Sequence, residues 1–400
     1  MKKSESQRII EIIHKTESRA MHNVLPVVWK TADKEIVTDT NNKKYIDFTS
    51  GICVTNAGHG NPKIWRAIME EATEGLLHSY TFYTKERADF LEYLIKHTPK
   101  FIEKAFLVSA GTEATEAAIK LMKMYGMQKF NRNKKIIISF EGAMHGRTML
   151  SEQLRGRNEN NKWAFNTHST EVCLMNFPKK DVKFNPDDIF YNTNTIAGII
   201  IESYQGWSAR FYPKQYMKDL VKWCKKNNIL VCFDEIQSGM GRTGKLFNYM
   251  HYEVQPDLIC VGKGFTSSLP MSGVLGRKDI LDIPEEGSMS STHSANPLCC
   301  AIGLANFKEI KKLLPDVERK GKLLYKGLKK LFSKYEINGK GLLYGIITPS
   351  EKYATKVCLK AMKKGLLLIK TGRESIKIAP PLCVSDINIK KGLKILEEVR

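Results

Sequence analysis

Two short apolar runs in the middle of the chain each lead into a charged residue. Ile229–Phe233 runs directly into Asp234, and Leu258–Val261 reaches Lys263 after one glycine. Short apolar runs bounded by turn-forming residues are typical of buried parallel strands, and such sheets bind ligands where their strands end. An acid and a lysine are rarely buried unless they are paired or functional. The pattern predicts either a structural ion pair or a reactive site, and these residues alone leave both open.

Two other segments place polar groups where strands are expected to end. In Ser109–Glu113, Gly111 lets the backbone come close to a ligand, and Thr112 adds a hydroxyl beside the unpaired N–H groups of a helix start, as a phosphate site requires. The same residues also suit an ordinary helix cap. In Gly142–Thr148, Arg147 could hold a carboxylate through its planar fork of N–H groups. Neither segment decides the chemistry alone.

These groups together match the needs of pyridoxal phosphate chemistry. A lysine can form a Schiff base with the aldehyde of the cofactor, and an acid can keep the pyridine nitrogen protonated so that the ring withdraws electrons. A helix start can anchor the phosphate, and an arginine can hold the carboxylate of an amino acid. If the expected strands share one sheet, these four functions would fall to Lys263, Asp234, Gly111–Thr112 and Arg147.

Two further patterns are rejected. His145 has no second ligand at metal-binding spacing, so a hydrogen-bonded structural histidine is expected there, and no metal site. Gly239–Lys245 nearly matches a nucleotide-binding loop, but Leu246 replaces the hydroxyl residue that magnesium needs. The segment also lacks a strand directly before it, which argues against a P-loop nucleotidase.

Strands and helices alternate through the middle of the chain, which predicts an α/β protein with a mostly parallel sheet covered by helices. The main helices between strands are expected at Thr112–Tyr125 and Lys214–Lys226. The expected strands are Ala105–Ser109, Lys135–Phe140, Ala197–Glu202, Ile229–Asp234, Leu258–Gly262 and Gly273–Gly276.

Both ends of the chain follow a different pattern. Near the start, Ile36–Thr38 and Tyr45–Phe48 predict a hairpin, and helices follow at Pro62–Thr73 and Glu86–His97. Beyond residue 300 the pattern predicts two long helices and then a compact α+β unit, with segments at Ala301–Leu314, Asp316–Tyr335, Gly341–Thr348, Lys352–Lys364, Leu366–Lys370, Ser375–Ala379 and Asp386–Arg400. We therefore expect a large domain over residues 56–305 and a small domain made of residues 1–55 and 306–400.

The composition argues against several classes of protein. Lys and Arg outnumber Asp and Glu by 63 to 42, a net charge of +21, which raises the possibility of a nucleic-acid binder. The lysines are scattered over polar faces, however, so we expect a solvated surface that favours anionic substrates and no nucleic-acid partner. No apolar run could span a bilayer and the start lacks an apolar signal core, which favours a cytoplasmic protein. The nine cysteines include no CxxC pair, and those in apolar runs (Cys232, Cys260 and Cys358) are expected to be small buried side chains.

Motifs spread over nearly the whole chain resemble the class III, fold-type I family of pyridoxal-phosphate-dependent aminotransferases. They occur in the order of the family, which makes the set far more specific than any one motif. They are Tyr45–Phe48, Gly51–Ile52, Gly58–Pro62, Ser109–Glu116, His145–Thr148, Asp234–Lys245, Gly262–Gly264, Ser291–His293 and Asn296–Pro297. The resemblance, which extends to 4-aminobutyrate and acetylornithine aminotransferases, implies the fold-type I architecture and pyridoxal 5'-phosphate as the cofactor.

The resemblance also implies a role for each residue of the cofactor site. Lys263 would carry the cofactor and move a proton on the substrate, and Asp234 would pair with the pyridine nitrogen. Gly111 and Thr112 would bind the phosphate. Thr292 would reach the phosphate of the cofactor in the neighbouring subunit, so a homodimer or a larger assembly is implied. The other implied contacts are Gln237 on the phenolic oxygen, Ile236 and Met144 on the ring faces, and His145 and Glu202 beside the cofactor.

Four positions bear on the choice of substrate. By resemblance, Ile52 matches 4-aminobutyrate enzymes, where ornithine enzymes carry Tyr, and Arg147 matches the arginine that holds the carboxylate of an ω-amino acid. Relatives that accept glutamate carry Glu and Arg where this chain has Trp207 and Lys377. Lysine cannot supply the planar fork of arginine, and whether Lys377 or nearby Arg373 binds a carboxylate stays open. We therefore expect an amino acceptor other than 2-oxoglutarate, such as pyruvate.

The resulting prediction is transamination of a small ω-amino acid similar to 4-aminobutyrate, with a 2-oxo acid as acceptor. An acetylornithine or other diamine-type aminotransferase is the alternative within the family. A racemase or aminomutase on the same fold is a further alternative, because such enzymes return the amine to the carbon skeleton.

Overall fold

A seven-stranded sheet forms the centre of the computed structural model, which describes residues 3–21, 25–156 and 171–400. The strand order is β4-β10-β9-β8-β7-β5-β6. β10 is antiparallel to both of its neighbours and the other pairs are parallel, which confirms the expected mostly parallel sheet. The strands are β4 (Lys104–Val108), β5 (Ile136–Phe140), β6 (Val172–Met175), β7 (Ile196–Glu202), β8 (Leu230–Asp234), β9 (Leu258–Val261) and β10 (Ser272–Gly276).

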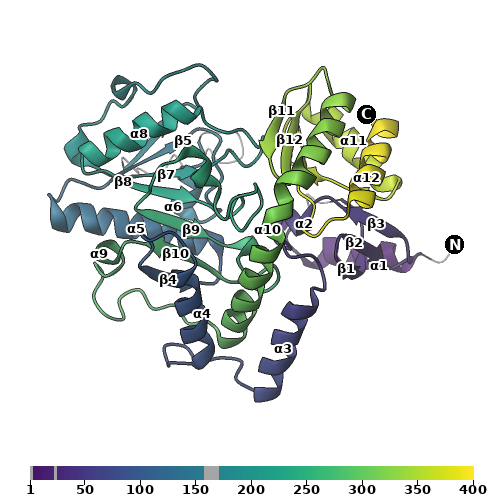
Figure 1. Ribbon diagram of the computed structural model, residues 1–400, viewed down its shortest axis with the longest axis horizontal. Coiled ribbons are helices and arrows are strands. Elements are labelled where there is room, and N and C mark those ends of the chain that lie inside the picture. Colours follow the sequence, from purple (N-terminus) through teal and green to yellow (C-terminus); the bar gives the residue numbers. More distant parts are fainter. Residues whose placement is uncertain (1–2, 22–24, 157–170) are drawn as a thin grey trace.

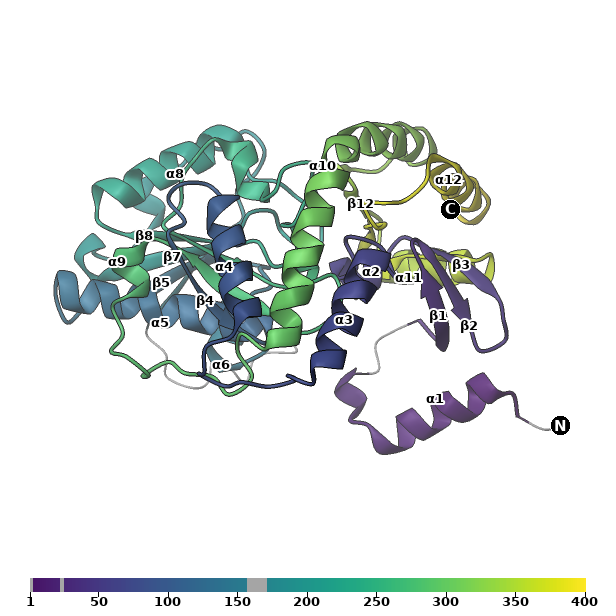
Figure 2. The same ribbon diagram turned by 60° about the horizontal axis from the view of Figure 1, so that its bottom comes forward.

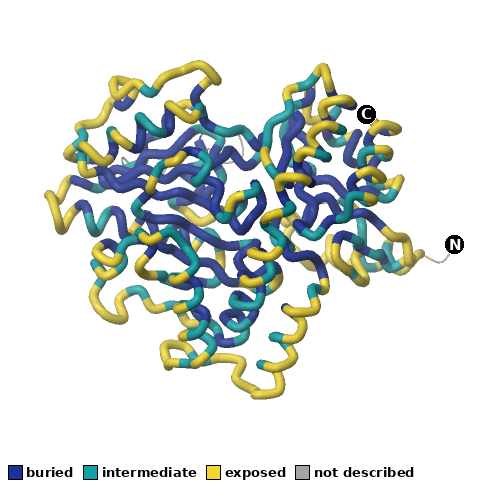
Figure 3. Tube along the Cα trace, viewed as in Figure 1, coloured by how far each residue is buried: buried dark blue, intermediate teal, exposed yellow. Residues whose placement is uncertain are grey.

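Helices cover both faces of this sheet, which explains why its inner strands are almost entirely apolar. Every residue of β5, β7, β8, β9 and β10 is buried (Figure 3). Ile137 packs in the apolar cluster that contains α5 (Gly111–Lys129), whereas the next residue, Ile138, packs in the cluster that contains α8 (Lys214–Lys226). Neighbouring residues of one strand therefore point to opposite faces, as the pleat requires.

The carboxyl ends of the parallel strands lie along one edge of the sheet. Glu202 at the end of β7 is in register with Asp234 at the end of β8, and Asp234 is in register with Cys260 of β9. β4 points the same way, because β10 is antiparallel to both β4 and β9. Residues that follow these strands therefore gather at this edge.

Two four-stranded sheets make up the smaller part of the structure (Figure 1). The first has the order β1-β2-β3-β13, and its β2 and β3 form the expected hairpin, with Ile36 opposite Ile46. The second has the order β11-β12-β15-β14. Because β13 pairs with β3, both ends of the chain contribute to one unit. The strands are β1 (Trp29–Asp33), β2 (Ile36–Asp39), β3 (Lys44–Asp47), β11 (Ile337–Lys340), β12 (Leu343–Ile347), β13 (Leu366–Leu367), β14 (Ile369–Lys370) and β15 (Ser375–Ile378).

The sequence predicted one strand over Leu366–Lys370, but this segment forms two strands in different sheets. β13 pairs with β3, whereas β14 pairs with β15 in the other small sheet. The chain passes from one sheet to the other at Leu368, whose side chain is buried. An apolar run predicts extended backbone but does not specify the partner strand, and here the partner changes within five residues.

α10 (Pro297–Leu331) is a single helix of 35 residues, where the sequence predicted two helices on either side of Pro315. A proline removes one backbone hydrogen bond and usually bends or ends a helix. Phe307, Ile310 and Leu324 on the two sides of this proline are completely buried, so the packing of the helix outweighs the lost bond. α10 runs from the large sheet region to the small sheets, and the expected domain boundary at residue 305 falls inside it (Figures 1 and 2).

The remaining helices surround these sheets. α3 and α4 pack against α10, and α12 packs against both α10 and α11. α1 lies at the N-terminal end, with none of its residues buried (Figure 2). Among the described helices, none is long and apolar enough to cross a membrane. The bounds are α1 (Glu5–Thr16), α2 (Ser50–Cys53), α3 (Pro62–Glu74), α4 (Lys85–Lys96), α6 (Met149–Gln153), α9 (Lys278–Leu281), α11 (Glu351–Lys363) and α12 (Asp386–Val399).

The cysteines are free thiols, and all nine except Cys383 are buried. This confirms the expectation that Cys232, Cys260 and Cys358 serve as small interior side chains. Burial raises the pKa of Cys300 and of Cys358 to about 12, so these two thiols stay protonated near neutral pH.

The guanidinium of Arg242 is completely buried where the large sheet region meets the small sheets. Its Nη2 donates to Oδ1 of Asn56 at 2.5 Å and to Oγ of Ser50 at 3.2 Å. Its Nη1 donates to the carbonyl oxygens of Pro380 and Leu342. One side chain thus joins segments that are far apart in the sequence.

Replacing this arginine by lysine should destabilise the protein. In Arg242→Lys the charge is kept, but the planar fork that reaches four acceptors is lost. We expect the free energy of unfolding in urea to fall by about 2–4 kcal/mol, because buried acceptors lose charge-assisted hydrogen bonds. Arg132→Lys at an exposed position is the matched control and should change stability little. Equal stabilities of the two variants would contradict the bridging role of Arg242.

Candidate active site

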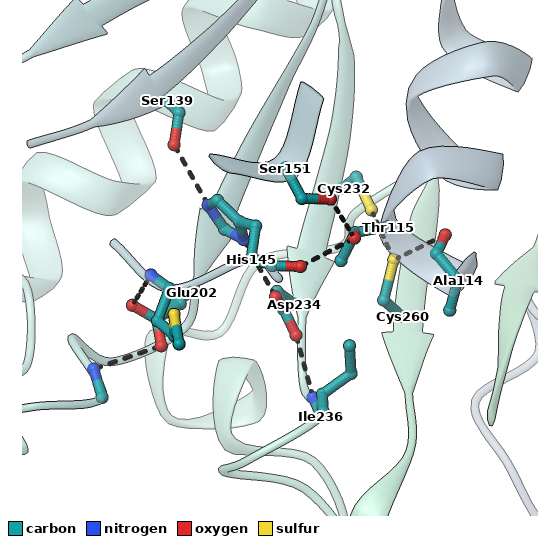
Figure 4. Close-up of polar contacts among 12 residues, drawn as sticks. Ala114, Thr115, Ser139, His145, Ser151, Glu202, Cys232, Asp234, Ile236 and Cys260 are labelled. Atoms are coloured by element: carbon teal, nitrogen blue, oxygen red, sulfur yellow. Dashed lines mark hydrogen bonds and ion pairs between the residues drawn. The ribbon is translucent and has the colours of Figure 1, made fainter. Parts of the chain in front are cut away.

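Asp234 lies at the end of β8 with its side chain buried, and it forms the centre of a group of polar contacts (Figure 4). Its Oδ2 is 2.9 Å from Nδ1 of His145, and its Oδ1 accepts the N–H of Ile236 at 3.0 Å. Nε2 of the same histidine is 3.0 Å from Oγ of Ser139 in β5. The histidine is therefore a buried, hydrogen-bonded residue, as its sequence context indicated, and it orients the carboxylate.

Lys263 follows β9 by two residues and does not pair with Asp234. Its φ is 46°, in the left-handed region that only a few non-glycine residues occupy. The glycines around it allow close approach: a Cβ at Gly262 would lie 2.6 Å from Oγ of Ser272. The side chain is half-buried and has no hydrogen-bond or ion-pair partner among residues 3–21, 25–156 and 171–400. A strained backbone and an unpaired amine are features of a functional lysine.

The start of α5 forms the next part of this edge. A Cβ at Gly111 would lie 3.1 Å from Cδ1 of Ile236, so the bare backbone of the helix start comes close to that side chain. Oγ1 of Thr112 is 2.7 Å from Oγ1 of Thr148, in the segment that follows β5. A Cβ at Gly146 would lie 2.3 Å from Oγ1 of Thr112, so glycine is required where the two segments meet.

Gln237 and Lys377 are linked directly, which the sequence did not indicate. Nζ of Lys377 donates to Oε1 of Gln237 at 2.8 Å and to the carbonyl oxygen of Gly206 at 2.9 Å. The hydroxyl of Tyr204 donates to the same Oε1 at 2.6 Å. The amide oxygen of Gln237 thus accepts two hydrogen bonds, and the NH2 group of the same amide is left to donate elsewhere. Burial lowers the pKa of the completely enclosed Lys377.

Glu202 at the end of β7 is a second buried carboxyl beside Asp234. Its Oε2 accepts the N–H of Met144 at 2.9 Å, and its Oε1 accepts the N–H of Gly206 at 3.2 Å. Burial raises its pKa to about 7, although His145 and the two backbone N–H groups act in the opposite direction. This group titrates near neutral pH.

α2, which carries Ile52, is a left-handed helical turn. φ is 50° at Ser50, 57° at Gly51, 62° at Ile52 and 64° at Cys53. Such a backbone is costly for a β-branched residue and collects at functional sites. Cys53 and Tyr204 belong to one small apolar cluster, and the hydroxyl of Tyr204 contacts Gln237, so the turn lies near the pair formed by Gln237 and the buried lysine. The side chain of Ile52 is 48% exposed.

Two further predicted site residues are exposed, as Ile52 is. Arg147 and Thr292 are exposed in the protomer. The carbonyl oxygen of Thr292 is 3.0 Å from Nε2 of His78, which fixes its loop. Trp207, by contrast, is partly buried, and the guanidinium carbon of Arg373 lies 4.9 Å from the centre of its ring.

The residues at this edge fit pyridoxal phosphate. Asp234 offers a buried acceptor for a ring nitrogen, Lys263 offers an unpaired amine for an aldehyde, and the amide NH2 of Gln237 offers a donor. The helix start at Gly111 offers backbone N–H groups for a phosphate, and the absence of a Cβ there lets Ile236 pack close to it. Ile236 packs between this helix start and Gly262, where it can cover one face of a ring.

Sequence reasoning missed two side chains that hold the site together. The sequence could have pointed to Ser139, because it is the single hydroxyl residue in the apolar run of β5. Tyr204 carried no such signal, since a tyrosine after a strand is common and only the tertiary structure brings its hydroxyl to Gln237.

Comparison with known proteins gives consistent matches over the whole chain. Residues 16–399 match the family model for class-III aminotransferases. Acetylornithine aminotransferase of Clostridium acetobutylicum is 36% identical over 371 residues, which are 90% of this chain and 92% of the relative. An acetylornithine/succinyldiaminopimelate aminotransferase of Photorhabdus laumondii is 34% identical over 91% of this chain and 90% of the relative. Among solved structures, acetylornithine aminotransferase from Elizabethkingia anophelis has a TM-score of 0.84 at 29% identity, over 99% of each chain.

The raised pKa of Glu202 predicts a pH dependence of stability. The pKa of the neighbouring Glu235 is also raised to about 7, mainly by burial. Because the folded protein holds these protons more tightly than the unfolded chain does, stability is greatest below pH 4.5 for these groups and falls as pH rises towards 7. Glu202→Gln and Glu235→Gln should each remove part of this decline, measured as unfolding midpoints of the cofactor-free protein between pH 5.5 and 7.5.

His251 contributes a dependence of opposite sign, because burial lowers its pKa to about 4. That contribution is common to all the variants and cancels when their pH profiles are compared. If both glutamine variants kept the full decline of the parent protein, the raised pKa values would be wrong.

Proposed function

This chain belongs to the class-III aminotransferases, which depend on pyridoxal phosphate, and we propose from this premise that it transfers the side-chain amino group of an N-acylated diamino acid to a 2-oxo acid. N-acetylornithine is the representative donor. The similarity to acetylornithine aminotransferases, at 36% identity over 90% of the chain, is the observation that supports this donor most directly.

The residues of the site would divide the work of this reaction. When bound, pyridoxal phosphate supplies an aldehyde that combines with amines and a ring that withdraws electrons. Lys263 would hold the aldehyde end and then move a proton on the carbon that carries the amino group. Asp234, oriented by His145, would accept the pyridine N–H. Gln237, whose oxygen is held by Lys377, would donate its NH2 group to the phenolic oxygen.

The charges around the site favour a donor with one free amino group. Burial lowers the pKa of Lys377 and nearby Lys263 lowers it further, against opposite effects from Cys53 and Glu202. Arg155 acts in the same way on Arg373. Free ornithine would bring a second ammonium group into these cationic surroundings, at a cost in electrostatic repulsion. Acylation removes that charge and keeps the carboxylate.

The relatives favour this donor over the 4-aminobutyrate predicted from the sequence. That prediction rested on Ile52 and Arg147, two positions in a chain of 400 residues. Both lie on the exposed side of the site, where one shared residue says little about the length of the substrate. The names of the relatives also favour an aminotransferase over a racemase or aminomutase.

A panel of donors tests the proposal. N-acetylornithine, ornithine and 4-aminobutyrate would be compared by kcat/KM, each with 2-oxoglutarate and with pyruvate. We expect N-acetylornithine to exceed the others by about 10-fold or more, because each competitor lacks a group or adds a charge. Lys263→Ala should abolish turnover and the absorbance of the lysine-bound cofactor.

Two outcomes of this panel would overturn the proposal. A preference for 4-aminobutyrate would restore the donor predicted from the sequence. Recovery of an inverted or rearranged donor, without an oxo product, would indicate a racemase or aminomutase instead.

We also propose that the working unit is at least a dimer. Thr292, the residue implied to act across subunits, is exposed in the protomer and lies next to His78. The segment around that histidine carries exposed apolar side chains, and Phe82 is 77% and Tyr83 is 98% exposed. Large exposed apolar side chains gathered in one segment are typical of a protein interface.

A single charge in this segment tests the assembly. Phe82→Glu should shift the species seen by light scattering from a dimer of 45.5 kDa chains to a monomer, and should weaken cofactor binding. Phe190→Glu, at a phenylalanine that is 94% exposed elsewhere on the surface, is the matched control and should stay dimeric. A fully active monomeric parent protein would rule the proposal out.

A further inference from the structure

Two hydrogen-bond donors without protein acceptors meet beside Gly142, just after β5. Nε1 of Trp207 is buried and has no hydrogen-bond partner among the residues that the structure describes. A Cβ at Gly142 would lie 3.3 Å from this atom and 3.5 Å from Nη1 of Arg373, so both donors border the same small space. Nε2 of Gln205 is also close, but it already donates to the carbonyl oxygen of Glu141 at 2.8 Å. A buried donor without an acceptor is costly unless a ligand satisfies it.

Arg373 is positioned by an aromatic ring and not by an acid. Its guanidinium carbon is 4.9 Å from the centre of the Trp207 ring, which is a cation–π distance. The hydrogen bonds of Arg373 within the described chain involve only its backbone, with Thr371 and Ser375. Its five N–H groups are therefore available to a ligand.

The guanidinium of Arg373 is affected by charges of both signs. Burial lowers its pKa, and Arg155 lowers it further, against weaker opposite effects from Glu374 and Glu202. Arg155 donates through Nη1 to Glu152, while its Nε is buried and has no partner within the described part of the chain. The guanidinium of Arg373 and the indole N–H of Trp207 border one space beside Gly142, and an anion is the ligand that these groups would attract.

Lys377 is less suited than Arg373 to bind a carboxylate. Its side chain is only 3% exposed, and its ammonium donates to Oε1 of Gln237 and to the carbonyl oxygen of Gly206. Two of its three N–H groups are thus occupied, and its burial leaves little of the ammonium open to a ligand. Lys377 is therefore a positioning residue for the glutamine amide.

We propose that Arg373, stacked on Trp207, binds the carboxylate of a substrate with its guanidinium fork, and that the indole N–H of Trp207 adds a further donor. This inference rests on the proposed function, because an aminotransferase takes two substrates that carry carboxylates. The carboxylate belongs either to the amino donor or to the 2-oxo acid. Both have the same chemistry, and the two half-reactions separate them.

Binding of a carboxylate probe gives the first test, which needs no knowledge of the donor. Glutarate would be titrated into the holoenzyme by calorimetry. Arg373→Gln should weaken its binding by about 10- to 100-fold, the loss expected for a charge-assisted pair. Arg373→Lys should restore part of the affinity, because it keeps the charge without the fork. Trp207→Phe, which keeps a ring but removes the N–H, should weaken binding less than Arg373→Gln does.

Arg210 provides a matched control. Its guanidinium carbon lies 5.7 Å from the centre of the same Trp207 ring, but its Nε and Nη2 each donate to the carboxylate of Glu336 at 3.3 Å. Arg210→Gln removes a stacked arginine that already has an acid, so the affinity for glutarate should stay unchanged. Equal effects of Arg210→Gln and Arg373→Gln would show that stacking, and not carboxylate binding, is what was lost.

Single-turnover half-reactions then identify the substrate. If the donor carboxylate is bound, Arg373→Gln slows the reaction of N-acetylornithine but not that of N-acetyl-1,4-diaminobutane, which lacks the carboxylate. If the acceptor carboxylate is bound, the variant loses affinity for 2-oxoglutarate or pyruvate but not for propanal. Unchanged glutarate binding and unchanged half-reactions in Arg373→Gln would overturn the proposal.

The proposed donor and the proposed role of Arg373 can fail separately. A parent enzyme that ignores N-acetylornithine refutes that donor, while glutarate binding still decides the role of Arg373. A loss of glutarate affinity in Lys377→Met, with none in Arg373→Gln, would assign the carboxylate to the buried lysine instead.

Discussion

Much of the site is arranged around the buried carboxylate of Asp234 at the end of β8. A buried carboxylate needs donors, and they come from Ile236 on its own strand end and from His145 in the segment after β5. Delivering the histidine folds that segment back against the start of α5, where Gly146 leaves room for the hydroxyl of Thr112. The acid and the helix start, which are proposed to bind opposite ends of one cofactor, are thereby held at a set separation.

The small sheets complete this site from the other side. Arg242 ties Asn56 and Pro380 together inside the protein, and the left-handed turn at Ser50–Cys53 and the strand that carries Lys377 lie close to these points. The long α10 packs against both parts, so the two halves of the site are held by one continuous element. Groups from both ends of the chain therefore reach a site that the large sheet alone would leave open.

The residues proposed to bind the cofactor and those proposed to bind the substrate lie in different surroundings. Asp234 and His145 are enclosed and bonded to protein, which suits a group that remains bound through every turnover. Arg373 is stacked on an indole without an acid, and Arg147 is exposed, which suits ligands that enter and leave. Lys377 shows that a cation near a substrate site can instead be used to orient a neighbouring amide. Residue type alone does not separate these roles.

The sequence by itself determined the family, the parallel sheet and the reactive groups at strand ends. Period-two and apolar patterns depend on local backbone geometry, and motifs such as Asp234–Lys245 keep their spacing along the chain. The partners of the reactive groups depend on contacts between distant segments, so only the tertiary structure could assign His145 to Asp234 and Tyr204 to Gln237.

The difference between local patterns and contacts of distant segments also explains the two errors in the predicted secondary structure. It explains as well why the sequence could not choose between two cations for carboxylate binding. Pro315 predicts a helix end from local bonding, but buried side chains on both sides of it keep α10 continuous. Leu366–Lys370 predicts one strand, but two different sheets take its halves. Lys377 and Arg373 stand four residues apart as equivalent cations in the sequence. Tertiary packing distinguished them. It enclosed Lys377 among hydrogen-bond acceptors, whereas it placed the guanidinium of Arg373 beside the ring of Trp207, with no side-chain acceptor among the described residues.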